Sequence, residues 1–140
     1  MIHLAFSTNE IERCFPTMFQ LRPHLKSEDF AAQVLQQMRT GYQLAYISDK
    51  EKDVAIGIAG FYIANSLSWG KYLYVADLVV DQNHRSQGYG EQLFDWVMNH
   101  AKDNDCEQFH LDSGVQRFAA HRFYMRQKMN ITSHHFVLKF

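Results

Sequence analysis

The chain has 140 residues, of which 46% are apolar and 21% charged, and its 14 lysines and arginines nearly balance 15 aspartates and glutamates. This composition excludes a disordered chain and predicts one domain, residues 1–140, with enough apolar material for a core. A net charge of -1 provides no cationic surplus for a nucleic acid or an anionic membrane, and no apolar run is long enough for a membrane span. With two cysteines and no secretion signal at its start, the protein is expected to be cytoplasmic.

Apolar residues at helical spacing predict two helices after a short first strand, Ile2 to Phe6. Pro16 lies inside the first helix and either kinks or divides it, because proline has no backbone N–H to donate. Ser27 is expected to cap the second helix, and Thr40-Gly41 to end it.

Three antiparallel strands are predicted next, joined by short turns: Tyr42 to Ser48, Val54 to Leu67 and Lys71 to Val80. The third strand is rich in Tyr, Leu and Val and is therefore expected to be buried on both faces.

From Gly90 the apolar period changes to that of an amphipathic helix, which a short strand, Phe109 to Leu111, follows. This β-α-β order predicts that strands 71–80 and 109–111 run parallel. A last helix is predicted from Phe118 to Gln127, with Ala119, Ala120, Phe123 and Tyr124 turned inward, and a last strand over residues 131–140. The predicted fold class is α+β, a mixed and mostly antiparallel sheet with helices on its faces.

The loop from Asp81 to Gly90 joins a strand to a helix and contains two glycines, Gly88 and Gly90. Free backbone amides converge at such a helix N-terminus, and Arg85 adds a fixed charge, so the loop is a candidate site for a diphosphate. The third glycine of a dinucleotide fingerprint and the Gly-Lys-Ser/Thr of a P-loop are missing, which disfavours nicotinamide dinucleotides and ATP. The alternative is that the glycines serve only the tight entry into the helix.

Asp77 is a carboxylate in an otherwise apolar strand. Burying such a group costs several kcal/mol unless it is paired or protonated. Two interpretations stay open: Asp77 is a general base that takes a proton from a substrate, directly or through water, or it is a structural acceptor for a backbone amide or a tyrosine hydroxyl.

Arg85-Ser86-Gln87-Gly88-Tyr89-Gly90 resembles the Arg/Gln-x-x-Gly-x-Gly/Ala signature of the GNAT superfamily of N-acetyltransferases. Leu78-Val79-Val80, Leu111-Asp112-Ser113-Gly114 and Ala120-His121-Arg122-Phe123-Tyr124 occur in the order and at the spacings of that family. Leu21-Arg22-Pro23-His24-Leu25 is similar to one bacterial subgroup, so the resemblance covers essentially the whole chain.

The resemblance implies the GNAT fold, splayed at its central parallel strand pair, with acetyl-CoA as cosubstrate. It implies that the backbone of strand 78–80 pairs with pantetheine, that the amides of residues 87–90 hold the pyrophosphate, and that Tyr124 protonates the leaving sulfur. Arg117 replaces a family Asn and is expected to bind a phosphate or a substrate anion. Lys128 replaces a helix-ending Gly, so that local strain or an altered turn is expected there. The cofactor-binding residues so implied are Leu78, Val79, Val80, Arg85, Ser86, Gln87, Gly88, Tyr89, Gly90 and Arg117.

The predicted function is acetyl transfer from acetyl-CoA to a primary amine by direct attack in a ternary complex. The acceptor is either a small-molecule amine or a protein N-terminus or lysine, and a homodimer joined through the last strand is expected. The alternatives are a non-catalytic acyl-CoA binding module and an interaction scaffold. No metal is expected, because His134 and His135 would point to opposite faces of a strand.

Overall fold

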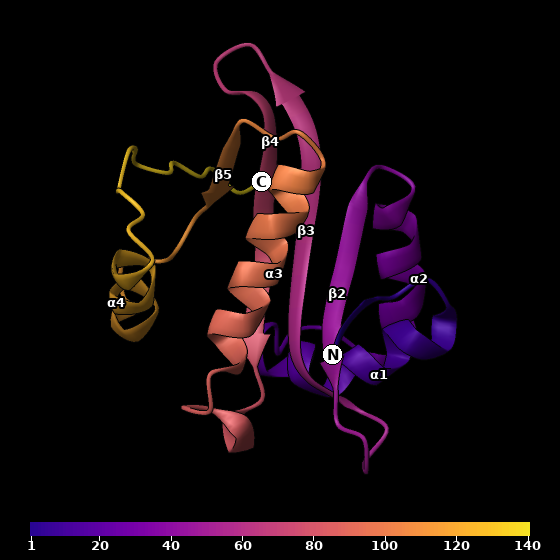
Figure 1. Ribbon diagram of the computed structural model, residues 1–140. Helices are drawn as coiled ribbons and strands as arrows, with labels where there is room; N and C mark the ends of the chain where they lie inside the picture. The colour runs from indigo at the N-terminus through magenta and orange to yellow at the C-terminus, as the bar shows by residue number, and fades with distance from the viewer. The chain divides into compact units, whose positions relative to one another are not determined.

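A five-stranded sheet in the order β1-β2-β3-β4-β5 organises the computed structural model, which describes all 140 residues (Figure 1). Strands β1 to β4 pair antiparallel, and β4 and β5 form a parallel pair. The mixed, mostly antiparallel sheet of an α+β fold is thereby confirmed. The strands are β1 (Ile2–Leu4), β2 (Tyr42–Ser48), β3 (Ala55–Ser66), β4 (Gly70–Val80) and β5 (Gln108–Leu111).

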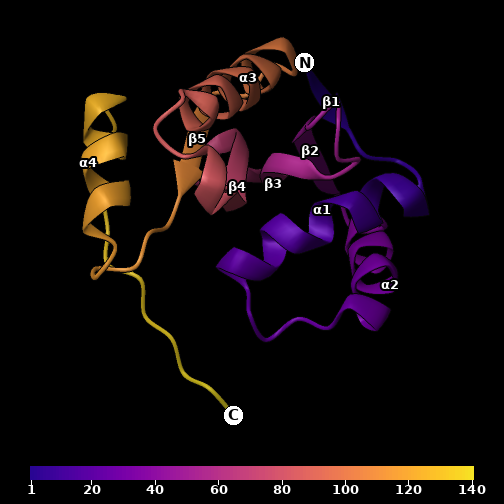
Figure 2. The same ribbon diagram turned by 90° about the horizontal axis from the view of Figure 1, so that it is seen from below.

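The chain divides into two compact units, Met1–His110 and Leu111–Phe140. In the first unit, helices α1 (Thr8–Leu21) and α2 (Ser27–Met38) cover one face of the sheet, and α3 (Tyr89–Asp103) covers the other (Figure 2).

Helix α1 is continuous and begins with a capping box. The Ser7 hydroxyl accepts from the Glu10 amide, and the Glu10 carboxylate accepts in return from the amides of Phe6 and Ser7. Pro16 lies inside the helix and does not divide it. The cap predicted for α2 was wrong by one position: Lys26 is the N-cap residue, without a side-chain bond, and Ser27 is the first helical residue.

Strand β3 has the longest run of consecutive buried residues in the sheet. Its first seven residues are all buried, because it lies in the middle of the sheet between α1 and α3. The prediction that β4 is buried on both faces was wrong: only Leu73, Val75 and Val79 are buried there, and Asp77 is half-buried. The half-open strand leaves polar backbone and side-chain groups accessible beside the core.

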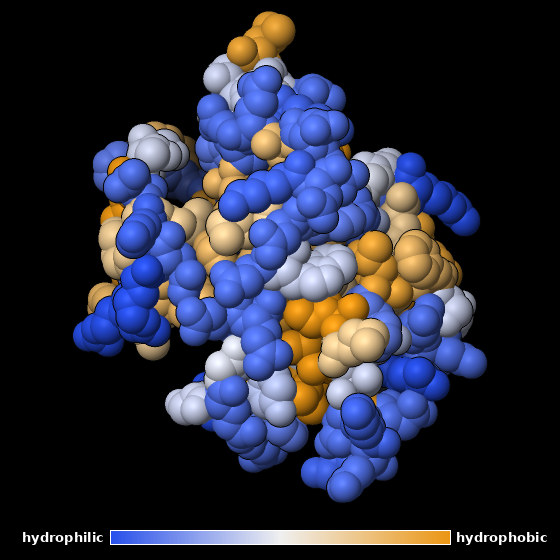
Figure 3. Space-filling view, in the orientation of Figure 1, coloured by the Kyte–Doolittle hydropathy of each residue, from blue (hydrophilic) through white to orange (hydrophobic).

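Helix α3 has the two-sided character that its sequence predicts. Leu93, Phe94, Val97 and Ala101 are buried against the sheet. The opposite face of α3 is hydrophilic where it faces the viewer in Figure 3. Burial of one apolar stripe therefore fixes the orientation of α3, and with it the position of the loop that precedes the helix.

The second unit contains α4 (Phe118–Arg126) and an extended C-terminal segment. The predicted last strand was wrong, since residues 131–140 form neither strand nor helix: no neighbouring strand pairs with their backbone. The inward stripe of α4 is also weaker than predicted, because Ala120, Phe123 and Tyr124 are half-buried and Ala119 is exposed. None of the helices has the length and apolar character that crossing a membrane requires.

Of the two outcomes expected at Lys128, the structure shows local strain in an ordinary left-handed turn and not an altered turn. Lys128 has a φ of 63°, in the left-handed region that glycine adopts without strain. Its amide donates to the Met125 carbonyl, and the Met129 amide donates to the Tyr124 carbonyl, which together close the end of α4 as a Schellman motif.

Candidate functional site

The loop between β4 and α3 has the backbone geometry of an anion cradle. Gly88 is the N-cap residue of α3 with a φ of 83°, and no side chain caps the helix. The first amides of a helix have no intrahelical partner, so those that follow Gly88 are available to an anion. Nothing lies within 4 Å of the position that a Cβ on Gly88 would take, so conformation rather than crowding requires glycine there.

A second left-handed residue, Ser86, lies two positions earlier, with a φ of 61°. Non-glycine residues in this conformation cost on the order of 1 kcal/mol and are concentrated at functional sites. Arg85, Ser86, Gln87 and Gly88 are all exposed. The loop therefore presents its backbone and the Arg85 guanidinium to the solvent.

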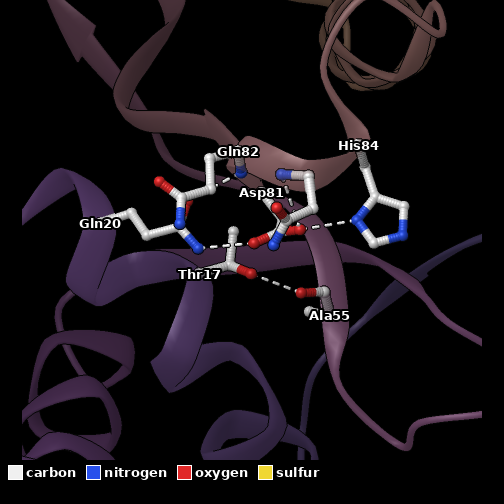
Figure 4. A network of polar contacts seen from close by, with 7 residues as sticks. Thr17, Gln20, Ala55, Asp81, Gln82 and His84 are labelled. Carbon is white, nitrogen blue, oxygen red and sulfur yellow. Dashed lines mark hydrogen bonds and ion pairs between the residues drawn. The ribbon is translucent and has the colours of Figure 1, made fainter.

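The start of the same loop is tied to α1 by a polar network (Figure 4). Gln20 Nε2 donates to Asp81 Oδ1 over 2.6 Å, and the Gln82 amide donates to Gln20 Oε1 over 2.9 Å. Asp81 Oδ2 lies 2.6 Å from His84 Nδ1 and accepts from the Asn83 amide. The bond from Gln20, followed by the contact with His84, lowers the pKa of the Asp81 carboxyl below its usual value.

Asp77 is held by partners from two other elements. Arg22, directly after α1, places Nη2 3.0 Å from Asp77 Oδ1, and the Tyr42 hydroxyl on β2 donates to Asp77 Oδ2 over 2.8 Å. Burial raises the pKa of Tyr42 well above its usual value, and the Asp77 charge raises it further, so the phenol stays protonated and keeps donating. The structural interpretation of Asp77 named a tyrosine hydroxyl as its partner, and Tyr42 supplies one.

A β-bulge in β4 precedes this carboxylate. Gly60 on β3 pairs with Asp77 and Phe61 pairs with Val75, so Ala76 has no residue opposite it. Arg22 Nη2 donates to the Ala76 carbonyl over 3.0 Å, which satisfies an oxygen that the bulge removes from the ladder. Arg22 thereby binds both the bulge and the carboxylate that follows it.

Gly60 makes room for this arrangement. A Cβ at that position would overlap the Tyr42 hydroxyl and lie 2.8 Å from Asp77 Oδ2. A glycine inside an apolar strand is a known sign of close approach by another group, and it is the one local signal in the sequence that could have indicated this contact.

Beyond Asp77, the three predicted coenzyme contacts on β4 pair with β3 through Leu78–Ala59, Val79–Ile58 and Val80–Gly57. Val79 is buried, and Leu78 and Val80 are half-buried. The first unit thus contains Asp77, strand 78–80 and the loop 85–90 along one continuous stretch of chain.

Tyr124 and Arg117 belong to the second unit. A cavity of about 640 Å³ in that unit is lined by Tyr124 together with His121 and residues of the C-terminal segment such as Thr132. Burial raises the pKa of the Tyr124 phenol, and the positive charge of Arg117 opposes that rise. His121 Nε2 lies 2.7 Å from the Gly114 carbonyl oxygen, a polar contact that ties α4 to the preceding loop.

Sequence reasoning missed the residues that hold the candidate site in place: Gln20, Arg22, Tyr42, Asp81 and His84. Each is unremarkable in its local pattern, and its role depends on a partner between 3 and 61 residues away in the chain. No group of three or more histidines, cysteines, aspartates or glutamates in the structure is arranged to hold a metal ion.

Comparison with known proteins agrees with this geometry. The uncharacterized N-acetyltransferase YhdJ of Bacillus subtilis (strain 168) is 32% identical over 135 residues, which are 94% of this chain and 93% of YhdJ. The fold is similar to that of an acetyltransferase from Trypanosoma brucei (TM-score 0.82, 18% identity, 100% of both chains). It is also similar to glucosamine-6-phosphate N-acetyltransferase from Arabidopsis thaliana (TM-score 0.78, 18% identity, 100% of this chain and 99% of the other).

The model of the acetyltransferase (GNAT) family matches residues 7–129, from the first turn of α1 to the residue after Lys128. That match includes β4, the loop with Gly88 and Gly90, α3 and α4. The chain therefore belongs to the GNAT family of N-acetyltransferases and is an acyltransferase.

Proposed function

We propose that this protein transfers the acetyl group of acetyl-CoA to a primary amine, by direct attack of the amine within a ternary complex. The observation that supports this proposal best is the loop before α3, where Ser86 and Gly88 are left-handed and no side chain caps the helix. Membership of the GNAT family makes the diphosphate of coenzyme A the natural occupant of that loop.

In this proposal the loop holds the coenzyme through its backbone. The amides of Gln87 to Gly90 bind the pyrophosphate, with Arg85 and Ser86 beside them. The backbone of Leu78, Val79 and Val80 pairs with the pantetheine arm. Arg117 binds a phosphate or a substrate anion, and a backbone amide of the strand that contains Val79 and Val80 stabilises the developing oxyanion.

Tyr124 is proposed as the general acid. The amine nitrogen forms a bond to the thioester carbon, the carbon–sulfur bond breaks, and the Tyr124 phenol gives its proton to the sulfur. Burial raises the pKa of Tyr124 above the usual value of about 10. The phenol therefore retains its proton at neutral pH, as a general acid must.

Asp77 is proposed as the acceptor of the amine proton, through a water molecule. Both of its oxygens are engaged, by Arg22 and by Tyr42. The carboxylate side chain is nevertheless 15% exposed, so water can reach it. The structural interpretation, in which Asp77 only orders β4, predicts a different mutational result, described in the Discussion.

The two compact units are proposed to act together as one acetyltransferase domain, residues 1–140, because the family model spans residues of both. The acceptor is proposed to be a small-molecule amine or a protein N-terminus or lysine, and the protein to be cytoplasmic. A homodimer is proposed because large apolar side chains of the C-terminal segment, Ile131, Phe136, Val137, Leu138 and Phe140, are exposed.

The test combines calorimetry with a thiol-release assay on the full chain. The parent protein should bind CoA, and one or more members of an amine library should trigger release of the thiol from acetyl-CoA. Tyr124→Phe should lower kcat about 100-fold or more, while the Kd of acetyl-CoA changes by less than about twofold. Tyr72→Phe, on β4 close to the turn between β3 and β4, is the matched control and should retain full turnover.

Three results would contradict parts of the proposal. No heat of binding with CoA would refute the coenzyme loop and favour an interaction scaffold. Binding of CoA without thiol release for any amine would indicate a non-catalytic binding module. Equal turnover in Tyr124→Phe and the parent would refute the general acid alone.

A further inference from the structure

The side-chain amide of Gln20, near the end of α1, acts both as a hydrogen-bond donor and as an acceptor. Its nitrogen donates to Asp81 Oδ1 over 2.6 Å, and its oxygen accepts from the Gln82 amide over 2.9 Å. A carboxylate could make only the second bond, since it has no donor, and an ammonium only the first. A side-chain amide therefore fits both partners as they stand in the structure.

Asp81, the acceptor for Gln20, also contacts two residues farther along the loop. Its second oxygen, Oδ2, lies 2.6 Å from His84 Nδ1 and 3.2 Å from the Asn83 amide. The His84 ring meets the Tyr89 ring edge to face, with centroids 6.3 Å apart. Tyr89 is the first residue of α3, so a chain of contacts connects Gln20 on α1 to the start of α3. The last contact in this chain joins His84, before Gly88, to Tyr89, directly after it.

The loop residues between these contacts have little else to hold them. Residues 85–88 are exposed, and two of them are left-handed. A free loop of this kind samples many conformations, and ordering it on binding costs conformational entropy. The contacts of Gln20 and Asp81 order the loop before the coenzyme binds and so remove part of that cost.

We propose that Gln20 and Asp81 are positioning residues for the coenzyme, which hold the loop before α3 in the conformation that binds its diphosphate. This inference rests on the proposed acetyl-CoA dependence. It adds that α1, an element which contributes no residue to the diphosphate loop, sets coenzyme affinity. The contacts of Gln20 and Asp81 affect binding and not the chemical step. Their loss should therefore raise the Kd of CoA and leave kcat at saturating acetyl-CoA unchanged.

The test exchanges donor and acceptor across the Gln20–Asp81 contact. Gln20→Glu places two carboxylates next to each other. In Asp81→Asn the new side chain has only one oxygen, so its amide nitrogen must face either the Gln20 nitrogen or His84 Nδ1. Each single variant should raise the Kd of CoA about tenfold by calorimetry. In the double variant Gln20→Glu/Asp81→Asn, the new asparagine nitrogen can donate to the new glutamate, which still accepts from the Gln82 amide, while the asparagine oxygen still accepts from the Asn83 amide. The double variant should therefore return the Kd to within about threefold of the parent value.

Asp53→Asn is the matched control, because it removes one charge from an exposed 2.9 Å ion pair between Arg13 on α1 and the turn between β2 and β3, and it should leave the Kd unchanged. Thermal unfolding of each variant separates positioning from stability: a merely structural anchor lowers the unfolding midpoint without altering the Kd of the folded protein. Single variants that bind CoA as the parent does, or a double variant that is no better than the singles, overturn the inference alone. A parent protein that does not bind CoA overturns the proposed function as well.

Discussion

The Tyr42 hydroxyl on β2 reaches across β3 to donate a 2.8 Å hydrogen bond to Asp77 on β4. The two strands are not neighbours in the sheet, and the contact passes over Gly60, where a side chain would collide with it. Together with Arg22, this bond orients the carboxylate that is proposed to receive the amine proton.

Comparison of Asp77→Asn with Tyr42→Phe separates the two roles of Asp77. Asparagine retains an acceptor for Arg22 and a polar group for Tyr42, but it cannot take a proton. If Asp77 is the base, Asp77→Asn should lower kcat about 100-fold at saturating acetyl-CoA, while Tyr42→Phe lowers it only a few-fold. Tyr42→Phe should lower the free energy of unfolding by about 1 kcal/mol. A kcat in Asp77→Asn within a few-fold of the parent value would leave only the structural role.

Substitution of the two loop glycines by alanine should weaken coenzyme binding for different reasons. Gly88→Ala forces a Cβ onto a residue with a φ of 83° and should cost about 1 kcal/mol in unfolding free energy as well as raising the Kd of CoA. A Cβ at Gly90 would lie an ordinary 3.7 Å from Val80, so Gly90→Ala should keep full stability. It should still raise the Kd of CoA, because the added methyl group obstructs the approach of a phosphate to the backbone.

These two variants are compared by calorimetry with CoA and by denaturant unfolding. Unchanged CoA affinity in Gly90→Ala would mean that this glycine serves only the packing of the helix start.

Cys14 should resist alkylation in the folded protein. It is fully buried, and burial raises the pKa of its thiol to about 12, whereas the usual value is 9.0. The reactive thiolate at pH 8 is therefore about 1,000-fold scarcer than in an unfolded chain, and its abundance rises with pH up to that pKa. Mass spectrometry after treatment with iodoacetamide should find Cys106, which is half-buried, labelled first, and Cys14 labelled only in denaturant. Equal labelling of both cysteines in buffer would contradict the burial of Cys14.

Lys128→Gly should stabilise the end of α4. Lys128 has a φ of 63°, which costs a residue with a Cβ roughly 1 kcal/mol and costs glycine almost nothing. The free energy of unfolding should rise by somewhat less than this, about 0.5 kcal/mol, because glycine gains entropy in the unfolded chain. Gln127→Gly is the control, since Gln127 has a φ of -78° and its replacement should lower stability. Denaturant midpoints that shift in the same direction for both variants would contradict the strain at Lys128.

Local patterns in the chain were sufficient to predict most of the secondary structure and the loop between a strand and a helix that contains Gly88 and Gly90. The apolar stripe of α3 and the apolar strands β2 to β4, which short turns separate, are recognisable because these patterns depend only on neighbouring residues. Gly88 and Gly90 were recognisable because they lie between a predicted strand and a predicted helix, although only Gly88 takes a left-handed conformation there. The C-terminal segment shows the limit of such patterns: its apolar residues are typical of a strand, but a strand forms only where a neighbour pairs with its backbone.

The amino-acid order alone thus determined most of the helices and strands and the loop between β4 and α3. Only the folded chain decided which side chains surround that place, because Gln20 and Asp81 are 61 residues apart, and Arg22 and Asp77 are 55 apart. No period of 2 or 3.6 residues relates positions so distant, and their contact arises from the packing of α1 against β3 and β4. The loop before α3 could therefore be predicted from the sequence, whereas the side chains that contact it could be identified only from the structure.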